Sequence, residues 1–146
     1  MKAAIIQQRA LRLITVKAVS FPDGIKGAWR EIESRRAIKG RKAYGLIYSS
    51  EDGMEYHAGL VSDGDLEERV TGLPVIEVPA GPCARMKLMD WNGRTEQIGP
   101  MFGRMIEEVE VDPTRPTMEF YRSFTELDLL VPIKKQRATS LPRDLV

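Results

Sequence analysis

The chain has 146 residues, of which 42% are hydrophobic and 29% charged. This is the composition of an ordinary globular domain with one sizeable core. The 22 basic and 21 acidic residues give a formal charge of +1, which argues against nucleic-acid binding driven by charge. One cysteine, Cys83, and one histidine, His57, exclude an intrachain disulfide and a cysteine or multi-histidine zinc site. We expect one domain over residues 1–134, a loose polar tail over 135–146, and neither metal nor cofactor.

The sequence also bears on where the protein works. No apolar run approaches the roughly 18 residues that a membrane-spanning helix needs. Residues 1–16 lack the long apolar stretch and the small-residue cleavage site of a signal peptide. We therefore expect a cytoplasmic protein that does not associate with a membrane.

In the first half of the chain, a strand is followed by a helix. Apolar and β-branched residues over 11–19 predict the strand. Asp23 is expected to cap the helix at its start and Gly40 to end it. Its buried face is indicated by apolar residues at i, i+3, i+4 and i+7, namely Ile25, Ala28, Trp29 and Ile32.

A hairpin and an edge strand are predicted next. Residues 42–48 and 54–61 are rich in β-forming residues and flank a short polar loop that contains glycine, the pattern of a hairpin. Residues 62–71 are polar and acidic and predict a loop. Residues 73–78 predict a short edge strand, because Pro74 suits an edge or a strand start.

The second half of the chain repeats this order. Residues 84–89 predict a strand, and residues 117–123 and 126–133 predict a second hairpin. Between them, helical spacing links six apolar residues: Ile98, Met101, Phe102, Met105, Ile106 and Val109. The chain therefore predicts an α+β fold of two βαββ units with pseudo-twofold symmetry. One antiparallel sheet would carry both helices on one face and a ligand cleft on the other.

Alternation along the strands separates the two faces of this sheet. One set of residues is plainly core and is expected under the helices: Ala43, Gly45, Ile47, Met118, Phe120, Leu127, Leu129 and Val131. The other set is expected in the cleft: Lys42, Tyr44, Leu46, Tyr48, Glu119, Tyr121, Ser123, Glu126, Asp128 and Leu130. Aromatic rings beside carboxylates suit an organic cation or a polar aromatic compound. The alternative is a solvated sheet face with tyrosines whose hydroxyls reach water.

Five short stretches, in order, resemble the GyrI-like small-molecule-binding domain, which is also the effector-binding domain of AraC-type and BmrR-type regulators. They span roughly residues 10–134 and read KGRKAYG at 39–45, YHAG at 56–59, VPAG at 78–81, IGPMF at 98–102 and ELDLLVPI at 126–133. The resemblance implies a duplicated βαββ fold whose cleft binds amphipathic, often cationic or aromatic, small molecules. It also implies an acid near the start of the last strand that points into the cleft, a position that Asp128 matches.

Residues and resemblance together predict a ligand-binding set: Tyr44, Tyr48, Tyr56, Trp91, Glu119, Tyr121 and Asp128. Glu119, Asp128 and Glu126 are candidate catalytic carboxylates, because two acids close together can shift their pKa values and one can act as a general base. A surface charge pair is the alternative for Glu119 and Asp128. Trp91 either walls the pocket or caps the core, whereas Trp29 is expected in the core.

Three functions stay open at this point. The first is a stand-alone protein that binds hydrophobic, aromatic or cationic compounds. The second is a hydrolase that acts on cyclopropane-type natural products, as some stand-alone members of the resembled family do. The third is a protein-interaction module similar to the gyrase inhibitors of that family. The expected partner is an amphipathic or aromatic small molecule; a protein partner stays open, and direct nucleic-acid binding is not expected.

Overall fold

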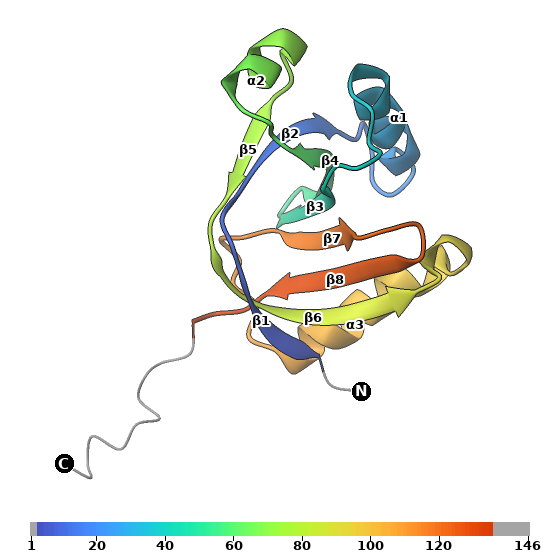
Figure 1. Ribbon diagram of the computed structural model, residues 1–146. Coiled ribbons are helices and arrows are strands. Elements are labelled where there is room, and N and C mark those ends of the chain that lie inside the picture. Colours follow the sequence, from blue (N-terminus) through green and yellow to red (C-terminus); the bar gives the residue numbers. More distant parts are fainter. Residues whose placement is uncertain (1–2, 136–146) are drawn as a thin grey trace, which may run out of the picture.

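The computed structural model describes residues 3–135 (Figure 1). Residues 136–146, which make up most of the predicted polar tail, lie outside the described residues. Eight strands form one curled antiparallel sheet in the described part. The strands are β1 Ala4–Gln8, β2 Leu11–Lys17, β3 Ala43–Ser50, β4 Gly53–Val61, β5 Val75–Val78, β6 Gly81–Met89, β7 Thr117–Tyr121 and β8 Glu126–Pro132. The helices are α1 Ile25–Arg35, α2 Asp65–Thr71 and α3 Ile98–Glu108, with short 3₁₀ turns η1 Trp91–Gly93 and η2 Thr95–Gln97 before α3.

The strand order shows the duplication. It runs β1-β6-β8-β7-β3-β4-β2-β5, so the three strands of each repeat, β2, β3 and β4 or β6, β7 and β8, are adjacent, and β3 and β7 join the two repeats at the centre. The strand that precedes each repeat is exchanged: β1 pairs with β6 of the second repeat, and β5 pairs with β2 of the first. The predicted α+β fold with two related βαββ units is confirmed.

Helices α1 and α3 cover one face of the sheet, where the larger core lies. Ala28 and Ile32 of α1 and Met101, Phe102 and Met105 of α3 are buried there against alternate residues of the central strands. The curl of the sheet encloses a second, smaller core on the other face. Its buried members are Leu13, Tyr44, Leu46, Val78, Cys83, Met118 and Leu130. Both faces of the central strands are therefore apolar.

The structure differs from the predicted elements at α1, at α2 and at β1. Residues 65–71 form α2 instead of a loop; three acidic residues stabilise its first turn, and Gly72 ends it in the left-handed conformation at φ 63. Helix α1 ends at Arg35, and Gly40 lies in a later turn. Asp23 does not cap α1; Gly24 holds that position without a side-chain cap. Strand β1 was not predicted, because its five residues are only partly buried.

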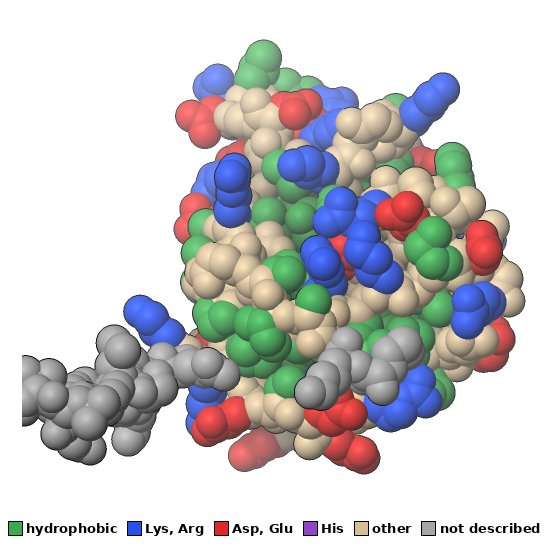
Figure 2. Space-filling model, turned by 60° about the horizontal axis from the view of Figure 1, so that its bottom comes forward, with side chains coloured by type: hydrophobic (Ala, Val, Ile, Leu, Met, Phe, Trp, Pro, Cys, Tyr) green, Lys and Arg blue, Asp and Glu red, His purple; other side chains and the backbone are tan. Residues whose placement is uncertain are grey.

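The surface mixes both signs of charge with hydrophobic side chains (Figure 2). None of the helices in residues 3–135 has both the length and the apolar character needed to cross a membrane.

Candidate functional site

A buried carboxylate, Glu119, lies at the centre of the sheet on the face that carries the helices. It belongs to β7 and is only 5% exposed. Tyr56 of β4 and Tyr121 of β7 both donate hydrogen bonds to its Oε1, each with an oxygen–oxygen distance of 2.7 Å. The indole Nε1 of Trp29, on α1, donates to the Tyr56 hydroxyl at 2.9 Å. One carboxylate oxygen thus ends a chain of hydrogen bonds that reaches from the helix to the sheet.

Further aromatic rings pack against the two tyrosines that bond this carboxylate. The Tyr121 ring contacts two indoles, with its centroid 5.4 Å from Trp29 and 5.1 Å from Trp91, both in edge-to-face geometry. Phe21, from the loop between β2 and α1, stacks 6.4 Å from Tyr56. We use the name aromatic cluster for Glu119, the two tyrosines that bond it and the three aromatic residues that contact those tyrosines. The five aromatic members are Phe21, Trp29, Tyr56, Trp91 and Tyr121. Both halves of the fold contribute to it.

The electrostatics of Glu119 are those of a carboxyl group without a counter-ion. No basic side chain of residues 3–135 pairs with it, since its contacts are the two tyrosine hydroxyls. Burial raises the pKa of the Glu119 carboxyl, and the hydrogen bonds from Tyr121 and Tyr56 oppose that shift. Burial, followed by the nearby Glu119 charge, holds the pKa values of Tyr56 and Tyr121 well above their usual range.

The second oxygen of this carboxylate, Oε2, is available to a ligand. It accepts no hydrogen bond from the described residues. It is not fully enclosed either: within residues 3–135 the buried side-chain atom without a partner is Asp128 Oδ1. Oε2 therefore reaches solvent-accessible space. A carboxylate with a free oxygen in a cluster of aromatic residues is suited to an organic cation, which ring faces attract as well.

The structure contradicts the predicted common face of Tyr44 and Tyr121. Tyr44 pairs with Phe120, and Gly45 pairs with Glu119, so Tyr44 points away from the face that carries Glu119 and Tyr121. Its ring stacks on Phe120 at 4.6 Å in the second core instead. Alternation separates the two faces of each strand but does not match the faces of different strands, and a shift of one residue exchanges them.

Glu119 and Asp128 are not a carboxylate pair. Asp128 lies opposite Phe120 in the β7–β8 register, so it shares a face with Tyr44 and Glu126 and not with Glu119. Its Oδ2 accepts a hydrogen bond of 2.6 Å from Arg122 Nε. The three candidate catalytic carboxylates are therefore divided between the two faces of the sheet.

Of the seven predicted ligand-binding residues, four come together in the aromatic cluster: Tyr56, Trp91, Glu119 and Tyr121. Tyr44, Tyr48 and Asp128 lie on the other face, and a role for them in binding stays a prediction. The sequence analysis missed Phe21 and assigned Trp29 to the core. The residue type of Trp29 already indicated a polar contact in the core, because a buried indole N–H needs a hydrogen-bond acceptor.

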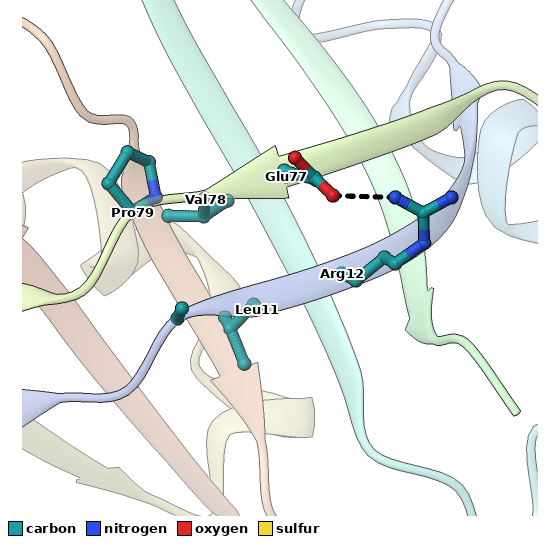
Figure 3. A pocket seen from close by; sticks show the side chains of 6 residues that line it. Leu11, Arg12, Glu77, Val78 and Pro79 are labelled. Atoms are coloured by element: carbon teal, nitrogen blue, oxygen red, sulfur yellow. Dashed lines mark hydrogen bonds and ion pairs between the residues drawn. The ribbon is translucent and has the colours of Figure 1, made fainter. Parts of the chain in front are cut away.

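Two cavities lie elsewhere in the described residues. One, of about 460 Å³, is bordered by Asp65, Glu68 and Arg69 of α2. The other, of about 350 Å³, lies where β2 begins and β5 ends (Figure 3). Its walls are Leu11, Val78 and Pro79 beside the Arg12–Glu77 ion pair of 2.6 Å. Arg12 also bonds Glu68, so this guanidinium is already paired on both sides and offers a ligand little.

The architecture agrees with the fold class that the sequence predicted. It is similar to SAV2435, whose structure was solved bound to tetraphenylphosphonium. The TM-score is 0.72 at 16% identity, over 92% of this chain and 94% of that one. A scan against protein-family models gives no match, and a search of curated proteins gives none either.

Two further solved structures share the fold. An integron cassette protein from Vibrio cholerae matches with a TM-score of 0.59 at 13% identity, covering 92% of this chain and 97% of that one. A hydrolase from Listeria innocua matches with a TM-score of 0.55 at 13% identity, covering 91% and 92%. At such identities the likeness establishes the fold alone.

Proposed function

We propose that the protein binds hydrophobic organic cations at Glu119. The observation that carries this proposal is a carboxylate that is 5% exposed, has no basic partner in the described residues, and is bonded by two tyrosines against which three further aromatic side chains pack. A buried charge is costly unless it is paired. A cation that enters the cluster supplies the missing partner.

The rings give the same ligand a second source of affinity. A cation over the face of Trp or Tyr gains about 0.5–2 kcal/mol, more when water is excluded. Trp29 and Trp91 both pack against Tyr121, so a bulky cation can contact several rings at once. SAV2435, which shares the fold, was solved with a cation of this kind, tetraphenylphosphonium, and this supports the proposal.

Glu119 is only 5% exposed, and neither of the two cavities described above is lined by it. A ligand the size of tetraphenylphosphonium therefore enters only if rings rotate aside. Phe21 is 36% exposed and lies in the loop before α1, and Trp91 lies in the short turn η1. Neither is held in the middle of a long helix or strand, so we propose that these two residues move first.

Binding is tested by calorimetry with two ions of the same shape and opposite charge, tetraphenylphosphonium and tetraphenylborate. We expect the cation to bind and the anion to bind far more weakly. Glu119→Gln should reduce affinity for the cation at least roughly tenfold, the effect of losing a charge-assisted contact. Glu126→Gln, on the other face, serves as the control. Equal binding of both ions, or an unchanged affinity in Glu119→Gln, would contradict the proposal.

A second candidate is hydrolysis of a strained, electrophilic ring. It is favoured by the fold shared with the Listeria innocua hydrolase and by the hydrogen bonds between Glu119 and two tyrosines. Glu119 would take a proton from water, the water oxygen would attack a ring carbon, and the breaking carbon–carbon bond would take a proton from Tyr56 or Tyr121. Mass spectrometry of a cyclopropane-containing electrophile decides this: one water gained per molecule, lost in Glu119→Gln, supports it, and unchanged compound contradicts it.

A further inference from the structure

We infer that the aromatic cluster selects cations without N–H donors, such as quaternary ammonium or phosphonium ions, over primary ammonium ions, and that Trp29 sets this preference. The inference rests on the proposed binding of organic cations at Glu119. It concerns which members of that class bind best.

The N–H and O–H donors of the cluster already have acceptors. Trp91 Nε1 donates to the Ser123 carbonyl at 2.9 Å, and Trp29 Nε1 donates to the Tyr56 hydroxyl at 2.9 Å. Both tyrosine hydroxyls donate to Glu119 Oε1. Of the two Glu119 carboxylate oxygens, Oε2 has no donor in the described part of the chain.

Trp29 fixes the direction of these hydrogen bonds. An indole nitrogen can only donate, so the Tyr56 oxygen accepts from Trp29 and directs its own hydrogen to Glu119. The two tyrosine oxygens lie 3.5 Å apart, and both of their hydrogens point to the same carboxylate oxygen. Trp29 thus takes one acceptor position of the Tyr56 oxygen, which makes this oxygen a poorer acceptor for an incoming ligand.

A primary ammonium brings three donors to a site with one open charged acceptor. Donors that lose their water without finding a new partner weaken binding. A quaternary ammonium or a phosphonium brings no donors, loses nothing in this respect, and keeps both the charge attraction to Oε2 and the contact with the ring faces. The same hydrogen bonds that hold Glu119 in place therefore discriminate between cations.

The test uses two cations with one skeleton, 4-tert-butylbenzyltrimethylammonium and 4-tert-butylbenzylammonium. The measured quantity is the ratio of their dissociation constants at neutral pH, compared between the wild type and Trp29→Phe. The difference in hydrophobicity between the ligands is the same in both proteins and cancels. Trp29→Phe keeps a ring but frees the Tyr56 oxygen to accept, so the preference for the quaternary ion should fall roughly tenfold.

Two further variants make the result decisive. Tyr121→Phe removes one donor from Oε1, opens that oxygen to the ammonium, and should shift the ratio in the same direction even if Trp29→Phe does not fold. Trp91→Phe removes an N–H that bonds Ser123 and should leave the ratio unchanged. An unchanged ratio in both Trp29→Phe and Tyr121→Phe would overturn the inference, as would an equal shift in Trp91→Phe. If neither cation binds the wild type, the proposed function itself fails.

Discussion

Gly45 lies directly opposite Glu119 in the β3–β7 pair, and a Cβ atom built on Gly45 would lie 2.6 Å from Glu119 Oε1. The same Cβ would also collide with the hydroxyl of Tyr56. The missing side chain at Gly45 is therefore what allows Tyr56 to reach Glu119. Gly45 and Glu119 are distant in the chain but paired at the centre of the sheet. Gly45 leaves free the space that the Glu119 carboxylate and the Tyr56 hydroxyl occupy.

Gly45→Ala should separate Tyr56 from Glu119. We expect it to lower the free energy of unfolding by about 1–3 kcal/mol, the range for a buried polar group that loses its partner, and to weaken binding of tetraphenylphosphonium. Gly59→Ala is the matched control on the next strand, because its Cβ would meet Leu13 at an ordinary 3.4 Å. Urea unfolding and calorimetry measure both effects. Equal losses in the two variants would show that the tyrosine–carboxylate contact is not the cause.

The raised pKa of Glu119 predicts a pH dependence of stability. Burial raises this pKa above its ordinary value of 4.5, so the folded protein holds the proton more tightly than the unfolded chain. The stabilisation from protonated Glu119 is complete at a pH below the ordinary pKa. It is lost as the pH rises through the raised pKa of the folded protein. We expect Glu119→Gln to flatten this part of the curve of unfolding free energy against pH. A wild-type curve that runs parallel to that of Glu119→Gln would argue against the shift.

Both tryptophans should report on a ligand at Glu119, because the rings of Trp29 and Trp91 both contact Tyr121. This differs from the expectation for an indole in the core, which a ligand would not reach. Trp29→Phe and Trp91→Phe should each retain part of the fluorescence change on titration with tetraphenylphosphonium. A complete loss of the signal in either single variant would mean that the other indole does not sense the ligand.

Arg122→Met should affect stability and not binding. Asp128 is 1% exposed, and Arg122 is the cation that pairs with it at 2.6 Å. Because the Arg122 side chain is 41% exposed, we expect a loss of about 1–3 kcal/mol, below the cost of breaking a fully buried pair. Arg85→Met is the control, because Arg85 lies on β6, the strand next to the β8 strand that carries Asp128. The affinity for tetraphenylphosphonium should stay within about twofold, since Asp128 and Glu119 face opposite sides; a larger drop would place Asp128 in the site.

Phe102→Ala tests the core under α3. Phe102 is 7% exposed and packs in the larger core, so its loss should cost about 3–5 kcal/mol in urea unfolding. Ile106→Ala, one turn further and 45% exposed, should cost far less. Similar losses at the two positions would show that α3 presents a different face to the sheet.

Local patterns were sufficient to predict most elements of the fold. The hairpin of β3 and β4 and the stripe of α3 repeat at the periods of strand and helix, and such periods depend only on neighbouring residues. The same reasoning missed α2, because its two large apolar residues, Leu66 and Val70, are 68% and 65% exposed. A helix without a buried apolar stripe gives no periodic signal.

The sequence by itself determined the α+β order of elements, its duplication, and the presence of acids and aromatic residues on the central strands. It could not determine which faces of these strands meet. The site depends on the pairing of Gly45 with Glu119, and a shift of one residue in that register would place Tyr44 beside the helices instead. Both faces of β3 are apolar because the curled sheet encloses a core on each side. Hydrophobicity therefore gives no indication of the face on which the ligand site lies, and only the tertiary pairing decided it.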